Sequence, residues 1–343
     1  MFRLLSGCCL LALVGIVGPV QARDLTVVGF GGSLQEAMRL AYFQPFAAAA
    51  GKPLIEESYE GGIAKIKAMV QTGAVTWDVV QMDDNEMMLA CDEGLLEKFD
   101  WPAIAEGPQI RANAKQPCGV GAFVWSMVAT HDPAKVQGVA SWADFWDLAK
   151  YPGKRGLRKQ ARMTLEIALL SDGVAPADIY KVLGTEAGVT RAFARLDQIK
   201  PQVQWWTSGA QPLQWLASGD VVMTAAYNGR VAAANKDGRN FKMSWLGQLY
   251  AMDFWAIVKG SPNAAEARKL VGLMMQAEPQ KTFAEAIGYG VTNVEAMKLI
   301  KASAKAELPT SDANLARALA ISPAFWVDHE EDLQKRFNTW VAQ

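Results

Sequence analysis

AAYNGR at residues 225–230 and YAMDFWAIVKG at residues 250–260 bound the stretch that decides the fold. The apolar residues before the first segment have the length and β-branching of a strand that is covered on both faces. Tyr227 and Arg230 follow at its carboxyl end, where open α/β sheets place ligands. In the second segment, Asp253 lies within an apolar and aromatic run, where an ionised carboxylate is costly unless a cation or several donors meet it. The stretch therefore predicts an α/β fold in which a cation, an anion and aromatic rings converge.

Arg230 and Asp253 can also simply neutralise each other or other charges of the protein. The rest of the chain favours a binding site instead, because it supplies an export signal and two lobes. It lacks the sequence motifs of common catalytic sites.

Residues 1–22 have the pattern of a cleavable secretory signal peptide. Arg3 is followed by an apolar run to Val17, a Gly-Pro break, and small residues at the cleavage positions up to Ala22. The run is too short and too close to the terminus for a membrane anchor. We predict cleavage after Ala22 and a periplasmic protein.

The charge of the chain argues against nucleic acid as a partner. The formal net charge of all 343 residues is −1, and loss of Arg3 with the signal peptide makes it −2. Lysines and arginines are spread along the chain rather than gathered in a stripe. The densest basic run, residues 154–159 with Arg162 beyond it, follows a Pro-Gly turn and is interpreted as a solvated loop.

Two cysteines remain once Cys8 and Cys9 leave with the signal peptide. Cys91 and Cys118 are predicted to form a disulfide, since an isolated pair in an oxidising compartment is most simply a bridge. Two free buried thiols are the alternative.

The N-terminal half predicts a parallel sheet. Residues 24–33 form a strand that runs into a glycine turn, and Leu34 to Ala50 follows as a helix. Further strands over Pro53–Ser58 and Trp77–Met82 alternate with helices. Phe30, at the glycine turn, can stack on a ligand or pack beneath the turn. A dinucleotide fingerprint is excluded because it needs a glycine where Leu34 stands.

Residues 83–86, Asp-Asp-Asn-Glu, make an acidic tip after the third strand. An acidic side chain there can cap the next helix or attract an amine. We predict that one aspartate caps the helix and that the other, Asp84, contacts the ligand.

Segments in this order resemble the extracytoplasmic solute-binding proteins of ABC importers. The early part of the resemblance lies in the strand-Gly-Gly turn, Gly61-Gly62 with the helix after it, Asp78-Val79-Val80 and Gly94-Leu95-Leu96. Later segments are similar to the spermidine/putrescine-binding branch and its γ-aminobutyrate-binding relatives: residues 165–170, 205–211, 219–222, 227–230, and Met252-Asp253 followed by residues 256–260. The match covers essentially the whole mature chain.

The resemblance implies a type II periplasmic-binding-protein fold, in which each of two lobes is a mixed sheet flanked by helices and the ligand lies in the cleft between them. Lobe 1 is expected over residues 23–130 and about 257–308, and lobe 2 over residues 131–256 and about 309–343. The lobes would close on the ligand like a hinge and then dock on an ABC permease in the inner membrane. We expect a monomer without a cofactor.

The resemblance also assigns roles to residues. Asp253 falls where that branch holds a ligand ammonium, Tyr227 falls where an aromatic ring stacks on the ligand, and Phe30 resembles the aromatic of the first lobe. An ammonium needs a charge-assisted acceptor, and an aromatic face adds cation–π attraction. The remaining ligand-binding residues that we predict are Ser33, Asp84, Trp206, Trp255 and Arg230.

Two departures from the polyamine binders point to another ligand. Residues 162–165, Arg-Met-Thr-Leu, stand where polyamine binders place further carboxylates, and we expect the nearby Glu166 to be an ordinary surface residue. Arg230 stands where a γ-aminobutyrate-binding relative uses arginine against the ligand carboxylate, and a guanidinium repels a diamine. The chain therefore favours a zwitterionic ω-amino acid such as γ-aminobutyrate. Neutralisation of Arg230 by Asp83, Asp84 or Glu166 would instead leave Asp253 to hold a polyamine such as putrescine or spermidine.

A secreted enzyme is the rival from another class. The chain has no Gly-x-Ser-x-Gly elbow, phosphate loop or helix with paired histidines. His131 and His329 lack ligand-like neighbours, so no metal site is predicted. A sensory protein that hands the same ligand to a receptor is a third possibility, which the sequence does not separate from transport.

Overall fold

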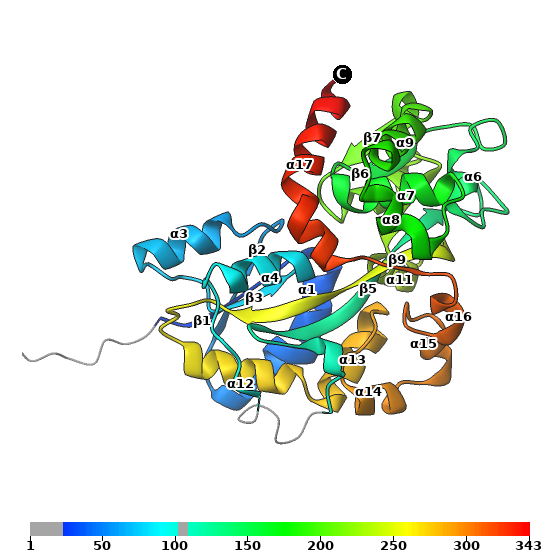
Figure 1. Cartoon of the computed structure of the whole chain (residues 1–343). Coiled ribbons are helices and arrows are strands. Elements are labelled where there is room, and N and C mark those ends of the chain that lie inside the picture. Colours follow the sequence, from blue (N-terminus) through cyan, green and yellow to red (C-terminus); the bar gives the residue numbers. More distant parts are fainter. Residues whose placement is uncertain (1–22, 102–108) are drawn as a thin grey trace, which may run out of the picture.

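The structure is a computed structural model that describes residues 23–101 and 109–343. The predicted signal peptide, residues 1–22, lies outside the described residues. What is described divides into two lobes, seen below and above in Figure 1.

The first lobe is built on three parallel strands with helices on both sides. All five residues of its central strand are buried, and this strand pairs parallel with its two neighbours, which confirms the predicted parallel sheet. Its elements are β1 (Leu25–Gly29), α1 (Gly32–Met38), the π-helical turn η1 (Arg39–Phe43), α2 (Gln44–Ala50), β2 (Leu54–Ser58), α3 (Ala64–Thr72), β3 (Val79–Met82), α4 (Asp84–Asp92), α12 (Ala264–Met274), α13 (Ala277–Ile287) and α14 (Val294–Leu299).

The second lobe repeats the plan with three further parallel strands. Its elements are α6 (Trp142–Trp146), β6 (Arg155–Arg158), α7 (Ala161–Ser171), η3 (Pro176–Asp178), α8 (Ile179–Leu183), α9 (Glu186–Asp197), η4 (Lys200–Gln202), β7 (Val203–Trp206), α10 (Gln211–Ser218) and β8 (Met223–Tyr227), with the C-terminal helix α17 (Pro323–Ala342) packed beside them. β6 pairs parallel with both β7 and β8.

Two long strands join the lobes. β5 (Gly119–His131) and β9 (Lys242–Ile257) are antiparallel neighbours that run from one lobe into the other (Figure 1). β9 also pairs antiparallel with β3, and β5 pairs antiparallel with β8, so the strand order is β2-β1-β3-β9-β5-β8-β6-β7. The sheet is therefore mixed, as predicted, and a side chain at the middle of β5 or β9 lies at the junction of the lobes.

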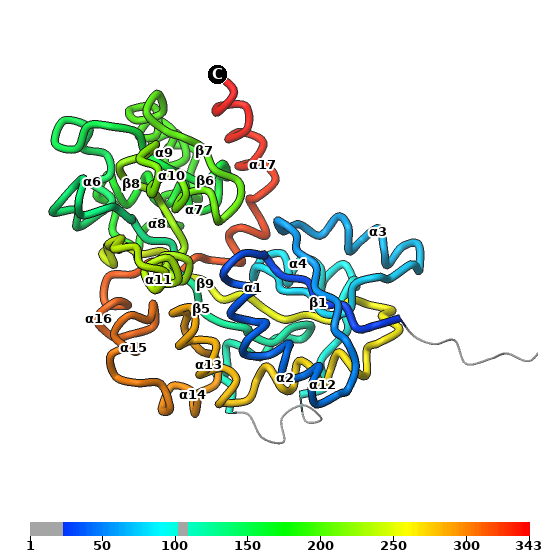
Figure 2. Tube along the Cα trace, turned by 180° about the vertical axis from the view of Figure 1, so that it is seen from behind, coloured from blue at the N-terminus to red at the C-terminus, as the bar shows by residue number. Residues whose placement is uncertain are grey.

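Several short elements remain. They are η2 (Ala112–Ala114), β4 (Lys115–Gln116), α11 (Asn228–Lys236), α15 (Ala302–Ala306), α16 (Asp312–Leu315) and β10 (Leu319–Ala320), which pairs parallel with β9. α11 contacts α1 and α13 of the first lobe as well as β5 and β8. It lies close to α1 in the rear view of Figure 2.

Local sequence fixes many helix ends. Gly51 and Gly73 end α2 and α3 in the left-handed conformation that glycine adopts most readily. Side-chain oxygens of Thr185, Asn293 and Ser322 accept hydrogen bonds from backbone N–H groups at the starts of α9, α14 and α17.

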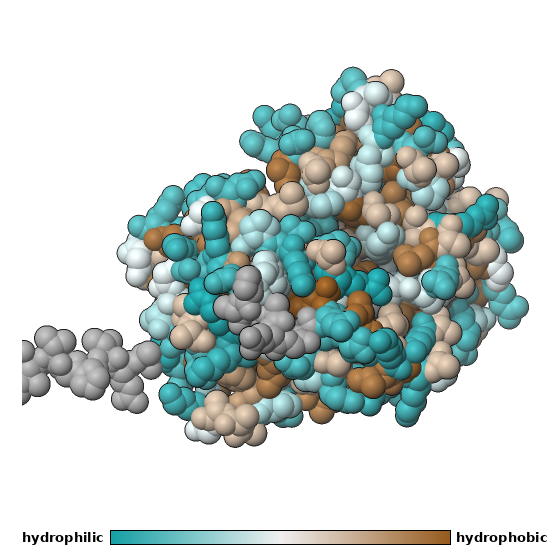
Figure 3. Space-filling view, turned by 60° about the horizontal axis from the view of Figure 1, so that its bottom comes forward, coloured by the Kyte–Doolittle hydropathy of each residue, from teal (hydrophilic) through white to brown (hydrophobic). Residues whose placement is uncertain are grey.

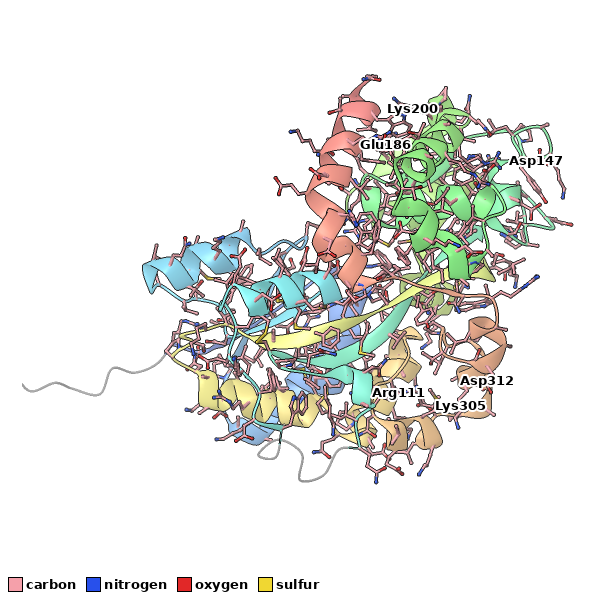
Figure 4. The ribbon with its side chains drawn as sticks, in the orientation of Figure 1. Arg111, Asp147, Glu186, Lys200, Lys305 and Asp312 are labelled. Carbon is pink, nitrogen blue, oxygen red and sulfur yellow. A yellow bond between two sulfur atoms is a disulfide. The ribbon has the colours of Figure 1, made fainter. Side chains whose placement is uncertain are left out.

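α17 is fastened to the second lobe along its outer end. Arg336 of α17 pairs with Glu186 at 2.7 Å, and the Lys200 ammonium lies 4.3 Å from the centroid of the Trp340 ring. Figure 4 places Glu186 and Lys200 beside this helix, whereas Arg111, Lys305 and Asp312 lie at the far end of the molecule.

The basic run at residues 154–162 is not a solvated loop, so that interpretation was wrong. Arg155 and Arg158 bound strand β6, and the Arg155 and Arg162 side chains are 0% and 1% exposed. The Arg155 guanidinium donates to the carbonyl oxygens of Phe145, Gly153 and Tyr151 at 2.6–2.7 Å, which replaces its hydration. The density of basic residues suggested exposure to solvent, but backbone carbonyl oxygens accept hydrogen bonds from the buried Arg155 side chain instead.

Cys91 and Cys118 form the predicted disulfide, with their Cα atoms 5.6 Å apart. It ties the end of α4 to the chain entering β5. Of the helices that the structure describes, none combines the length and the apolar character needed to cross a membrane. The face drawn in Figure 3 mixes hydrophilic and apolar residues without one dominant apolar area.

Candidate functional site

A cleft lies where the two lobes meet, and it leaves about 530 Å³ free of protein atoms, part of it open to solvent. Its lining comes from both lobes and from the junction: Phe30, Leu34, Glu60, Asp83, Phe123, Trp125, Arg158, Thr207, Gly209, Tyr227, Arg230, Asp253 and Tyr289.

Asp253 is the buried anion of this cleft. It lies on β9, between β3 and β5, and is 2% exposed. A donor from each neighbouring strand reaches its carboxylate: Gln81 Nε2 at 2.5 Å and Trp125 Nε1. Burial raises the pKa of Asp253 well above its ordinary value, and the Asp83 carboxylate raises it further, against the lowering effect of the two donors. Both donors are neutral, so the site favours a cation that would complete the pairing.

Arg230 supplies a cation from the first turn of α11, and its side chain is 8% exposed. Its Nη2 donates to the carbonyl oxygens of Phe30 and Gly31 in the first lobe, at 3.1 and 3.3 Å. Within residues 23–101 and 109–343, its Nε and Nη1 make no hydrogen bond, and no carboxylate lies within 4.0 Å of the guanidinium. Arg230 is therefore held by carbonyls, and part of it is left to meet an anion.

Aromatic rings form the walls between these two charges. The edge of Tyr227 meets Trp125 at 5.3 Å and Trp206 at 6.0 Å between ring centroids. Phe30 stacks on Tyr59 at 5.2 Å. On the first-lobe side, Phe123 and Tyr289 stack with their planes 5° apart; both line the cleft. These rings give the walls an apolar surface that suits a short methylene chain.

Arg158, at the end of β6, adds a second guanidinium that the sequence interpretation had placed in solvent. It donates a hydrogen bond to the Tyr227 hydroxyl and lies 5.8 Å from the Trp206 ring centroid. Tyr227 thus has its hydroxyl occupied by protein, while its ring remains part of the wall.

A second cluster of charged side chains joins the two lobes next to the cleft. Arg162, at the start of α7, pairs with Asp84 at 2.5 Å and Asp83 at 3.3 Å across the two lobes. Burial alone would lower the pKa of Arg162, but the carboxylates of Asp84 and Asp83 raise it above its ordinary value. On α17, Glu330 accepts from Asn85 Nδ2 at 2.6 Å and so joins the same contact.

Glu166 is not a surface residue, and that expectation was wrong. Its side chain is fully buried and accepts hydrogen bonds from Trp326 Nε1 at 2.7 Å and from the Tyr180 hydroxyl at 3.1 Å. Burial raises its pKa to about 7. Glu166 therefore ties α7 to α17 and does not reach Arg230.

Four of the eight predicted ligand-binding residues line the cleft together: Phe30, Tyr227, Arg230 and Asp253. The other four lie outside its lining. Ser33 lies on α1, Asp84 is paired with Arg162, and Trp206 supports Tyr227 from behind. Trp255 is 1% exposed and packs against Phe43 of η1.

The sequence interpretation missed several residues that line the cleft or hold a residue that lines it. Trp125 lies in an apolar strand, where the only hint was an indole N–H that needs a buried acceptor. Gln81 carried a similar hint as the one polar residue of β3. Tyr289 and Thr207 gave no such signal, because loop residues are brought to the cleft by the fold alone.

The arrangement suits the binding of a small molecule that carries charge. It combines the buried carboxylate of Asp253, the carboxylates of Glu60 and Asp83, two guanidiniums without a carboxylate partner in the described chain, and aromatic walls. Among the side chains that the structure describes, no group of three or more His, Cys, Asp or Glu could hold a metal ion.

Comparison with known proteins gives a consistent picture. Residues 41–310 match the family model described as bacterial extracellular solute-binding protein. The chain is 49% identical to the gamma-aminobutyric acid-binding protein of Pseudomonas aeruginosa over 324 residues. These residues cover 94% of this chain and 92% of that protein. It is 28% identical over 184 residues to the spermidine/putrescine-binding periplasmic protein of Escherichia coli, covering 52% and 51% of the two chains.

Solved structures agree with this likeness. A GABA receptor has a TM-score of 0.82 and 31% identity, over 94% of this chain and 98% of its own. AgtB from A. tumefaciens R10, in complex with agropinic acid, has a TM-score of 0.86 and 33% identity, over 94% and 99%. The predicted resemblance and the two-lobed fold are thereby confirmed.

Proposed function

This chain belongs to the bacterial extracellular solute-binding protein family, and from that premise we propose that it captures a zwitterionic ω-amino acid, γ-aminobutyrate or a close homologue, for an ABC permease. In this proposal it acts in the periplasm as a monomer, without a cofactor, and releases its ligand chemically unchanged. The ligand lies in the interlobe cleft with its ammonium at Asp253 and its carboxylate at Arg230.

The observation that carries the proposal is the pair of opposite charges that protein groups leave incomplete. Asp253 receives hydrogen bonds only from neutral donors, and Arg230 donates only to carbonyls, within the part of the chain that is described. A ligand with a charge at each end completes both. The relative of Pseudomonas aeruginosa with 49% identity, which is named for γ-aminobutyric acid, supports the same ligand class.

A polyamine fits these charges less well. The alternative required Arg230 to be neutralised by Asp83, Asp84 or Glu166, but Arg162 takes the two aspartates and Glu166 is bound to Trp326 and Tyr180. A diamine in the cleft would meet the guanidiniums of Arg230 and Arg158 as well as the carboxylates of Glu60 and Asp83. Like charges in a desolvated site oppose binding strongly.

A thermal-shift panel tests the ligand class. We expect γ-aminobutyrate and its neighbours in chain length to raise the melting temperature of ligand-free protein, since a ligand at 100 times its Kd adds about 2.7 kcal/mol of stability. Putrescine and spermidine at the same concentration should give little shift. A shift with the diamines and none with the amino acids would overturn the proposal, and consumption of γ-aminobutyrate would show an enzyme instead.

Binding should release a proton at pH values between the ordinary pKa of an aspartate and the raised pKa of Asp253. The pKa of Asp253 is raised in the free protein, so the carboxyl stays protonated as the pH rises above its ordinary range. A ligand ammonium favours the ionised form and lowers that pKa, so the proton leaves on binding. Affinity should therefore rise with pH through the raised pKa, by at most about tenfold per pH unit. Calorimetry in buffers of different ionisation enthalpy measures the proton directly, and proton uptake on binding would contradict the assignment.

A further inference from the structure

Two glycines that face each other across the cleft surround the Arg230 guanidinium. A Cβ atom added to Gly32, at the start of α1, would lie 2.6 Å from Nη1, and one added to Gly209, in the loop after β7, would lie 2.9 Å from Nε and 3.2 Å from Cζ. Real Cβ atoms essentially never lie closer than 3.0 Å to a neighbouring atom, so a side chain at either glycine would force the guanidinium or the backbone to move. We call the space between these residues the glycine slot.

We propose that Gly32 and Gly209 are positioning residues that set the ligand preference of this protein, because only their missing side chains let the Arg230 guanidinium occupy its place. This inference rests on the proposed function, and it adds that selection of a carboxylate depends on the slot as well as on the arginine.

The contacts of Arg230 explain how the slot acts. Nη2 is fixed by the carbonyl oxygens of Phe30 and Gly31, so Nε and Nη1 are the nitrogens left for a carboxylate. Those two nitrogens are the ones that a methyl group at Gly209 or Gly32 would displace. A guanidinium binds a carboxylate well only in a defined planar geometry, so a shift of this size costs recognition.

The slot also links recognition to closure. Gly32 belongs to the first lobe and Gly209 to the second, and the guanidinium lies between them. The glycine slot is therefore complete only while the two lobes are in contact. A carboxylate that holds the guanidinium in place would therefore stabilise the closed form, whereas a ligand without a carboxylate gains less from closing.

The two glycines differ in a way that sharpens the test. Gly32 has φ +61°, so a side chain there is strained regardless of space, whereas Gly209 is not among the positive-φ glycines. At Gly209 the atoms in the way are the end of a flexible arginine and one ring carbon of Tyr227 at 3.4 Å. Gly209→Ala should thus move the guanidinium with little effect on the fold.

The experiment compares γ-aminobutyrate with its amide, 4-aminobutanamide, which keeps the ammonium and loses the carboxylate charge. For Gly209→Ala we expect the preference for γ-aminobutyrate over the amide to fall by about ten- to a hundredfold, the effect of a misplaced buried contact. Gly272→Ala in α12 is the matched control, because a Cβ there meets nothing within 4 Å. Its preference should stay that of the unchanged protein, and its melting temperature should stay the same or rise slightly, because alanine favours a helix more than glycine does.

The outcomes separate this inference from the proposed function. If Gly209→Ala keeps the same preference for γ-aminobutyrate over the amide, whether or not both affinities fall, the proposed role of the glycine slot is wrong. Binding of γ-aminobutyrate by the unchanged protein would not be affected by that result. If the unchanged protein binds neither compound, the proposed function fails. A crystal structure of Gly209→Ala then still decides the slot, which predicts a displaced guanidinium and is refuted by one that has not moved.

Discussion

Replacing Asp253 by asparagine is expected to weaken γ-aminobutyrate binding by about 2 to 5 kcal/mol, because the ligand ammonium would be buried without its counter-charge. Asparagine keeps the size of the side chain, and its one carbonyl oxygen can accept from Trp125 Nε1, which now donates to Oδ1 of the carboxylate. Its NH2 group then takes the place of Oδ2, where the Gln81 amide must turn over to accept a hydrogen bond instead of donating one. The loss therefore reports charge rather than shape. Replacing Arg230 by methionine should cost a similar amount, since the ligand carboxylate would then lack its partner. Titration calorimetry with the mature protein measures both.

The two replacements differ in what they should do to other ligands. An Asp253→Asn protein should lose affinity for every amine. An Arg230→Met protein should lose affinity for ω-amino acids but gain affinity for putrescine, because a repulsive charge has gone. Unchanged γ-aminobutyrate affinity in either protein would mean that the ligand does not span these two residues.

Free-protein stability gives an independent control. The carboxyl of Asp253 has a raised pKa, so its ionised form is disfavoured in the folded protein compared with the unfolded chain. Asp253→Asn should consequently leave the free protein as stable as before, or more stable, at neutral pH. A sharp fall in melting temperature would show that asparagine damages the fold, and the affinity loss would then not measure charge alone.

The fold was predictable where sequence pattern and strand geometry coincide. Buried apolar runs with charge at their ends identified β8 and β9, and the alternation of strands with helices identified the parallel sheet. Arg230 and Asp253, which both line the cleft, were singled out for the same reason: a charge beside a buried strand needs an explanation. The lobe boundaries stay a prediction, because β5 and β9 belong to both lobes.

The rest of the site depends on pairing between distant parts of the chain. Gln81 reaches Asp253 across 172 residues, because β3 and β9 are neighbours in the sheet. Arg158 and Arg162 were misplaced because local charge density suggests solvent. The side chains that meet them, Tyr227 for Arg158 and Asp84 for Arg162, lie 69 and 78 residues away. Local pattern shows that a charge exists, but long-range register decides what it meets.

Replacing Arg162 by methionine is expected to destabilise the closed form by about 3 to 5 kcal/mol, because Asp83 and Asp84 would be left as unpaired carboxylates at the junction of the lobes. The lobes can relieve this cost by opening, since separation returns both carboxylates to water. Apparent affinity falls in proportion to the fraction of protein that is competent to close. Every ligand should therefore bind more weakly by the same factor, and the preference for γ-aminobutyrate over its amide should not change.

That uniform loss distinguishes the Arg162 cluster from the ligand contacts. Arg162 is 1% exposed and does not line the cleft, so it acts on closure and not on a particular ligand. The neighbouring Met163 has φ +72°, an unfavourable conformation for a residue with a side chain, and it lies in the non-helical first turn that carries Arg162 to the aspartates. Small-angle scattering of the ligand-free variant should show a larger radius of gyration than that of the unchanged protein.

Removing all three charges together, with Asp83→Asn and Asp84→Asn added to Arg162→Met, should restore much of the affinity, because the cost lies in the unpaired carboxylates rather than in the missing bridge. If the triple variant binds as weakly as Arg162→Met alone, the ion pair itself stabilises closure, and the free energy of closing then comes from this cluster as well as from the ligand.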